Sequence, residues 1–238
     1  MPALNRFTRA LWDLDTFNVG DLGLPAGWTD TLTDSGTIAI STADRGNVVL
    51  MTPSDGTVAD NDEVYRATPA AFKFSAGAPI YGRCTLQFAS TASGVYNVAF
   101  GFQNAVGANS IIDDGAGLKV SGSTLGIYKV DGETVWRCVS ACNGVATVSV
   151  SNVTATPGVW HKLEIEALDL DGVNMPVVFS VDGEKLKDAN GYVIRHSVPI
   201  ANAAMMAAFV GCKLGAITIN DTTKLAHNIY AAQKRLAS

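Results

Sequence analysis

The feature that most constrains the fold is a series of short runs in which apolar and polar residues alternate, separated by turn-forming residues. Examples are TIAIST near residue 37, NVVLMT near 47, GRCTLQFAS near 82, YNVAFGFQ near 96 and ETVWRCVS near 133. A period of two is typical of half-buried β-strands, and helical periodicity is almost absent before residue 221. Roughly a dozen such runs predict an all-β chain that packs two antiparallel sheets against each other.

The clearest local pattern lies in residues 158–186, GVWHKLEIEALDLDGVNMPVVFSVDGEKL. Two alternating runs flank an Asp- and Gly-rich segment, and the second run ends in Asp-Gly, which predicts a strand, a turn, a strand and a second turn. Glu164 and Glu166 have the parity of the solvent side of the first strand, and Leu163 has the other parity. Asp131-Gly132, in IYKVDGETVW, predicts a further hairpin with a two-residue turn.

The chain divides into an N-terminal arm at residues 1–20, a β-sandwich at 21–220, and a C-terminal helix and tail at 221–238. No linker separates two folded units, and single β-sandwiches reach this length. The helix is predicted from one apolar face in DTTKLAHNIYAAQKRL, formed by Leu225, Ile229, Ala232 and Leu236. We expect this helix to pack on its own sandwich.

The composition argues against two classes of partner. Hydrophobic residues make up 47% of the 238 residues and charged residues 16%, so the chain can bury a core. The net charge is -5 and the sequence has no cluster of Lys or Arg, which argues against a nucleic-acid partner. No segment is long and apolar enough to span a bilayer, and the N-terminus lacks the apolar core of a signal peptide. We therefore expect no membrane partner and synthesis in a cytosol.

Neither the cysteines nor the acidic clusters predict a metal or a cofactor. The chain contains four cysteines, Cys84, Cys138, Cys142 and Cys212. We expect mostly buried thiols, because a chain of this length does not need disulfides. Cys138 and Cys142 would share one face of a strand, but a zinc site needs two more ligands. The acidic clusters at 60–63, 113–114 and 169–171 match no calcium motif, and such clusters more often cap turns.

The segments TPGVWHKLEIEAL and VVFSVDGEKL resemble the concanavalin A-like jelly roll, including its laminin G-like members. In that family a Trp-led strand is followed by a strand that ends in a Val-Asp-Gly turn. The resemblance implies a two-sheet antiparallel jelly-roll sandwich and, by itself, no activity.

A second and narrower resemblance covers more of the chain. The runs TVADNDEVYRATPAAFKFSAGAPIYGRCTLQF and YNVAFGFQNA, the VDGE hairpin and the final QKRLAS look like tailed-phage virion proteins of this fold that associate with the capsid. Residues 60–63 match a DNDE-like segment of that group, and residues 77–79 match its Gly-x-Pro turn. The C-terminal segment departs from the group, whose members often end in a strand.

The virion resemblance implies a non-enzymatic decoration or cement subunit on the capsid surface, assembled in the host cytoplasm. Its expected partners are the major capsid protein and further copies of itself, and a homotrimer would match a three-fold position of an icosahedral lattice. The N-terminal arm mixes basic and large apolar side chains, which suits an interface. The contact candidates in this arm are Arg6, Phe7, Arg9, Leu11 and Trp12.

Two alternatives come from other classes of function. A carbohydrate-binding module would hold a surface glycan, and Trp160 is its candidate sugar platform. A jelly-roll glucanase would need two carboxylates about 5 Å apart. Glu164, Glu166 and Asp169 match the spacing of such a motif with exchanged residue types, but aromatic-rich cleft strands are missing around them. No catalytic residue is therefore assigned.

Overall fold

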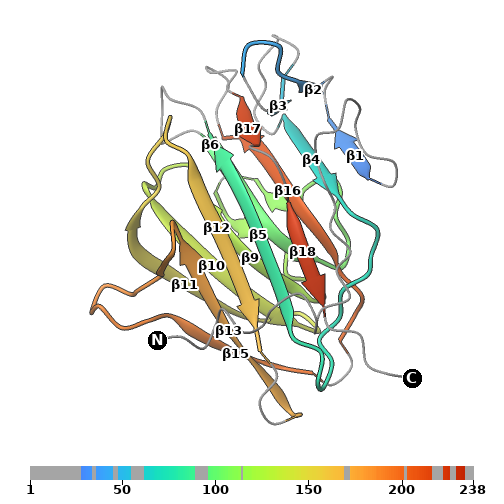
Figure 1. The fold of residues 1–238 in the computed structure, drawn as a ribbon, viewed down its shortest axis with the longest axis vertical. Coiled ribbons are helices and arrows are strands. Elements are labelled where there is room, and N and C mark those ends of the chain that lie inside the picture. The colour runs from blue at the N-terminus through green and yellow to red at the C-terminus, as the bar shows by residue number, and fades with distance from the viewer. Residues whose placement is uncertain are drawn as a thin grey trace.

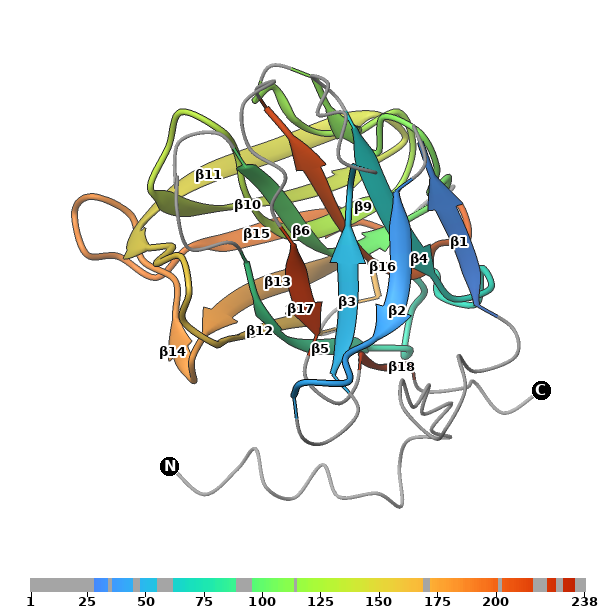
Figure 2. The same cartoon turned by 90° about the horizontal axis from the view of Figure 1, so that it is seen from above.

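The computed structural model shows two antiparallel sheets that lie face to face in two layers (Figure 1; Figure 2). The described residues are 28–33, 36–44, 48–54, 62–88, 96–113, 115–168, 172–200, 203–215, 222–225 and 229–233. All regular structure in these ranges is β-strand, so no helix in them is a candidate to cross a membrane. The prediction of an all-β, two-sheet fold is confirmed.

The strands form one sheet of seven, one of nine and a small sheet of two. The seven-stranded sheet has the order β1 (Thr29–Leu32), β4 (Glu63–Ala67), β16 (Ala207–Leu214), β6 (Tyr96–Gln103), β9 (Thr124–Lys129), β10 (Val135–Cys142) and β11 (Val145–Thr154). The nine-stranded sheet has the order β14 (Glu184–Lys185), β13 (Asn174–Val181), β12 (His161–Ala167), β5 (Ile80–Gln87), β17 (Thr223–Leu225), β3 (Val49–Thr52) and β2 (Thr37–Ile40), with β15 (Arg195–Pro199) beside β13 and β18 (Tyr230–Gln233) beside β5. The small sheet pairs β7 (Ile111–Ile112) with β8 (Gly117–Leu118).

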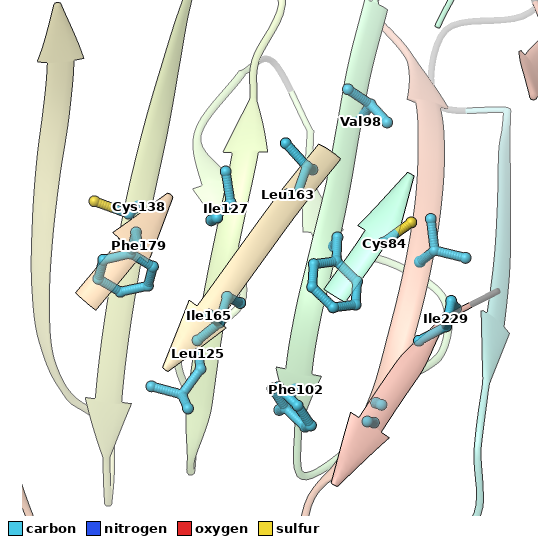
Figure 3. Close-up of a cluster of buried hydrophobic side chains, with 14 of the residues drawn as sticks. Cys84, Val98, Phe102, Leu125, Ile127, Cys138, Leu163, Ile165, Phe179 and Ile229 are labelled. Atoms are coloured by element: carbon cyan, nitrogen blue, oxygen red, sulfur yellow. The ribbon is translucent and has the colours of Figure 1, made fainter. Parts of the chain in front are cut away.

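The main core lies between the two large sheets, where alternate side chains of both inner faces meet. Leu163 and Ile165 of β12 face Leu125 and Ile127 of β9 in this space (Figure 3). The alternation that predicted the strands therefore also sorts their side chains into core and surface.

One glycine marks how closely the sheets approach each other. Gly82 lies on the inner face of β5, opposite Ile165 of β12. A Cβ at Gly82 would come within 2.6 Å of the Phe102 ring and 3.1 Å of the Phe100 ring. The two rings occupy the space that a side chain would need, so only glycine fits.

The four cysteines are free and buried, as predicted. Cys138 and Cys142 both enter the core from β10, which confirms that they share one face of the strand. Burial raises the pKa of Cys138 to about 12 and that of Cys212 to about 11. Both thiols therefore stay protonated at neutral pH.

The outer face of the seven-stranded sheet carries a second apolar cluster. Tyr65, Tyr128 and Phe209 face outward from β4, β9 and β16, and they pack beneath Ile111 and Leu118 of β7 and β8. The segment between β6 and β9 thus covers this face of the sheet.

A buried ion cluster holds the same segment in place. Lys213 of β16 is fully buried, and its ammonium donates to Asn109 Oδ1 (2.6 Å), Ile111 O (3.2 Å) and Asp113 Oδ1. It also forms an ion pair with Glu63 Oε2 at 3.2 Å. Glu63 in turn accepts a hydrogen bond from the backbone N of Asn109 (2.9 Å). Glu63 and Asp113, two of the predicted acidic residues, are thus partners of a lysine.

Two hairpins close with two-residue turns in which both residues have positive φ. Asn143-Gly144 joins β10 to β11, and Asp182-Gly183 joins β13 to β14. Asn-Gly and Asp-Gly favour such turns because they tolerate positive φ at both positions. The turn predicted at Asp182-Gly183 is confirmed. Asp131-Gly132 does join β9 to β10, but it lies in a longer loop in which only Gly132 has positive φ.

The helix predicted over 221–238 is wrong where the structure describes this segment. Residues 223–225 form β17 and residues 230–233 form β18, and both strands pair with β5. Leu225 of β17 and Ile229, directly before β18, were expected on one helical face and instead reach the main core from these strand segments. Pairing with β5 satisfies the backbone groups that a helix would have satisfied internally.

Candidate functional site

The outer face of the nine-stranded sheet displays a row of polar and aromatic side chains along β12. The odd-numbered residues of β12 are buried and its even-numbered residues are not, as predicted. Lys162, Glu164 and Glu166 therefore reach the outer face, and Trp160, directly before the strand, continues the row with 38% of its surface exposed. A strand rises about 3.3 Å per residue, so neighbours in this row are roughly 7 Å apart.

Strands β5 and β18 place two tyrosines and an arginine beside the row. The register pairs Glu164 with Arg83 and Glu166 with Tyr81, and it puts Tyr230 on the far side of Arg83. The Tyr81 and Tyr230 rings meet edge to face with centroids 5.6 Å apart. The Arg83 guanidinium lies 5.8 Å from the Tyr230 centroid, a cation–π contact that orients it.

The two carboxylates of the row lie in different environments. Glu164 accepts a hydrogen bond from the Tyr81 hydroxyl (2.7 Å) and forms an ion pair with Lys162 (2.9 Å). Burial raises the pKa of Glu166; Lys185 lowers it and the charge on Glu164 raises it further. Glu164 is thus engaged by a hydrogen bond from Tyr81 and an ion pair with Lys162. Glu166 holds its proton to a higher pH than an ordinary glutamate.

The loop that carries Trp160 is fixed to the sheet. Gln87 of β5 donates a hydrogen bond from Nε2 to Gly158 O (2.7 Å). On the inner side, His161 Nδ1 lies 2.9 Å from Asp182 Oδ2, in the turn after β13. These bonds hold the residues on both sides of Trp160 to the nine-stranded sheet, while the indole itself stays partly exposed.

The structure brings together only some of the candidate site residues that the sequence suggested. Glu164 and Glu166 share a face with Trp160, whereas Asp169 lies outside the described residues. The five arm candidates, Arg6, Phe7, Arg9, Leu11 and Trp12, also lie outside them. Among the side chains that the structure does describe, no three His, Cys, Asp or Glu residues gather in a way that could hold a metal ion.

Sequence reasoning missed Tyr81, Arg83 and Tyr230 as members of this face. The alternation in GRCTLQFAS gives the outward parity of Arg83, but it does not say which strand lies beside β5. Tyr230 was expected on a helix. The missing information is the long-range pairing of β5 with β12 and β18.

Comparison with known proteins shows the fold. No family model and no curated protein sequence matches the chain. Among solved structures, the lectin UEA-II complexed with galactose is 14% identical, with a TM-score of 0.59 over 94% of this chain and 100% of the lectin. The fold is the lectin-like jelly roll. The Emp47p carbohydrate recognition domain is 12% identical (TM-score 0.54; 92% of this chain and 96% of that domain).

An enzyme also shares this architecture. The endo-1,3-beta-glucanase from Streptomyces sioyaensis is 14% identical, with a TM-score of 0.50 over 90% of this chain and 99% of the enzyme. At such low identity these likenesses show the fold alone. The predicted concanavalin A-like sandwich is confirmed, and the predicted place on a phage capsid stays a prediction.

Proposed function

We propose that this protein is a non-enzymatic carbohydrate-binding module that holds a glycan on the outer face of its nine-stranded sheet. The observation that carries the proposal is the exposed indole of Trp160 in line with Lys162 and Glu164. A sugar ring offers an apolar face for stacking and hydroxyl groups for hydrogen bonds, and this row supplies partners for both. The shared fold of the galactose-complexed lectin and the carbohydrate recognition domain supports the proposal.

The environment of the carboxylates favours holding a glycan over cleaving it. A retaining glycosidase needs a nucleophile free to attack and an acid about 5 Å away. Glu164 is occupied by Tyr81 and Lys162, although the raised pKa of Glu166 is a property that a general acid would need. We therefore expect Glu166→Gln to keep glycan binding, and we expect neither the parent nor this variant to release reducing ends from β-glucans. Cleavage by the parent that Glu166→Gln abolishes would establish the glucanase alternative instead.

The proposal is tested by a glycan array followed by calorimetry on the bound glycans. Trp160→Ala removes the platform, and since stacking on an aromatic ring contributes on the order of 1 kcal/mol or more, affinity should fall roughly tenfold. Tyr192→Ala is the matched control, because Tyr192 is 73% exposed but lies on the turn between β14 and β15. Absence of binding to any glycan, or equal losses in both variants, would overturn the proposal.

We propose, as a second candidate, the decoration or cement role on a phage capsid surface, because one sheet edge is suited to protein contact. Strand β11 ends the seven-stranded sheet and reads VATVSVSNVT, without a charge or a proline. Its Val145, Val148 and Val150 are 76%, 50% and 46% exposed. Natural sheet edges usually carry charges or proline that prevent pairing with another chain, and this edge has neither.

The second candidate is tested on the native particle. Mass analysis and imaging should find many copies of this chain on an icosahedral shell, and Val148→Lys should reduce its attachment. Arg6→Glu and Trp12→Ala would show whether the arm takes part. A particle preparation that lacks the chain would remove this candidate and leave the glycan-binding proposal standing.

A further inference from the structure

The proposed binding face is basic, although the chain as a whole is acidic. Four strands of the nine-stranded sheet each contribute one cation to it: Arg83 from β5, Lys162 from β12, Lys185 from β14 and Arg195 from β15. Arg83, Lys185 and Arg195 are exposed, and Lys162 is half-buried. The net charge of the whole chain is -5, so this concentration of cations is local.

The strand register arranges these cations across the face. One transverse row runs from Tyr230 through Arg83 and Glu164 to Ser180 and Lys185. Neighbouring strands are about 4.8 Å apart, so Arg83 and Lys185, with β12 and β13 between them, are three spacings or roughly 14 Å apart. This distance suits a chain of sugars better than a single ring.

A second transverse row is offset from the first by two residues along each strand, for example from Glu164 to Glu166 on β12. It runs from Tyr81 through Glu166 and Val178 to Arg195. The cations of the two rows therefore surround the central carboxylates on both sides.

The carboxylates of the face are paired with or lie beside its lysines and leave its two arginines, Arg83 and Arg195, without an acidic partner among the described residues. Glu164 is paired with Lys162 and Tyr81, and Glu166 has a raised pKa and the charge of Lys185 beside it. Within the described part of the chain, neither Arg83 nor Arg195 forms an ion pair. An incoming ligand therefore meets two exposed guanidinium groups, whereas Glu164 and Glu166 are half-buried and lie beside lysines.

We propose that the ligand of this face is an anionic glycan, whose carboxylate or sulfate groups are bound by Arg83 and Arg195 while Trp160 stacks on a sugar ring. The inference rests on the proposed carbohydrate-binding function and adds the class of glycan. A guanidinium binds carboxylate and sulfate oxygens through two parallel hydrogen bonds. Contact with Tyr230 orients the Arg83 guanidinium before binding, which reduces the entropy lost when the ligand is bound.

The test compares matched charged and neutral polymers. Polygalacturonate is paired with its fully methyl-esterified form, and dextran sulfate is paired with dextran, so the two pairs separate carboxylate from sulfate recognition. Calorimetry should show at least tenfold tighter binding to the charged member of one pair, weakening as salt is raised because screening acts on exposed charges. Arg83→Gln combined with Arg195→Gln should remove this preference.

Controls separate recognition by this face from general attraction to polyanions. Lys119→Gln removes an exposed cation that lies before β9, in the segment covering the other sheet, and should leave binding unchanged. Thermal unfolding of each variant checks that it is folded. Equal affinity for charged and neutral polymers, or equal losses in the Lys119 and arginine variants, would overturn the anionic class while leaving the carbohydrate-binding function in place. Binding to no polymer and to no glycan on the array would overturn both.

Discussion

His196 ties the two large sheets together through both of its ring nitrogens. It lies on the inner face of β15, with Nδ1 at 2.9 Å from Ser140 Oγ and Nε2 at 3.0 Å from Ser149 Oγ, on β10 and β11. The Phe179 ring packs against it edge to face at 5.1 Å. Burial lowers the pKa of His196 to about 4, so the neutral ring is the folded-state form at neutral pH.

This histidine should make stability depend on pH. An unfolded histidine has a pKa of about 6.5, so the unfolded state binds more protons between pH 6.5 and 4, and the free energy of unfolding falls as pH falls through that window. The loss reaches about 3 kcal/mol at most. Urea unfolding at pH 7 and pH 4.5 should show a smaller loss in His196→Gln than in the parent. Equal pH slopes in the two proteins would show that His196 is not the titrating group.

The ammonium of Lys213 should contribute strongly to stability. Lys213→Met leaves the carboxylate of Glu63, 2% exposed, buried without its cation, and breaking a buried ion pair costs about 3–5 kcal/mol. Denaturant unfolding measures the loss. Lys119→Met, at an exposed lysine, is the control and should change stability by roughly 0.5 kcal/mol or less. Similar losses in both variants would mean that the cluster is energetically unimportant.

Single elements were predictable where the signal is local. The alternation in β12 gave its two faces correctly, and Asp182-Gly183 gave the turn after β13. The C-terminal strands were not predictable in the same way. Leu225, Ile229 and Ala232 recur at helical spacing, but pairing with a strand more than a hundred residues away outweighs that local pattern.

The turn after β13 provides a prediction for one element. Gly183 has φ of 87° and Asp182 has φ of 54°. Gly183→Ala forces a side chain into the left-handed region and should lower the free energy of unfolding by about 1 kcal/mol. Gly107→Ala is the control, because Gly107 does not have positive φ and a Cβ there would meet nothing within 4 Å. A control variant that is destabilised as much as Gly183→Ala would contradict this explanation.

At the scale of the whole molecule, the C-terminal segment is part of the sandwich and not an appendage. β18 pairs with residues 80–83 of β5 and places Tyr230 on the candidate binding face, while Ile229 and Ala231 enter the core. The proposed boundary at residue 221 therefore does not separate a tail from the β-sandwich in the described part.

Truncation tests this integration. Ending the chain at residue 228 removes β18 and exposes one side of β5, so the melting temperature should fall by several degrees, since 1 kcal/mol shifts it by about 2–4 °C in a chain of this size. Ending it at residue 233 keeps β18 and should leave the melting temperature nearly unchanged. Equal melting temperatures for the two truncations would show that β18 is dispensable.

The candidate site was predictable for the residues of one strand but not as a surface. Trp160, Glu164 and Glu166 were visible on one strand of the sequence. Arg83 and Arg195 were not connected with them, because the register that sets them beside β12 depends on pairings between distant strands. A binding face made across strands is a property of the assembled sheet.

The cluster around Lys213 has a consequence for how the protein withstands its surroundings. Its ammonium is enclosed by the side-chain oxygens of Glu63, Asn109 and Asp113 and by the carbonyl of Ile111, a set of ligands of the kind that hard cations prefer. Here the positive charge belongs to the side chain of Lys213 and not to a bound metal ion. Neither dilution nor a chelator can therefore remove it. The segment that covers the seven-stranded sheet is thereby locked in place by the chain alone, whatever ions the medium supplies.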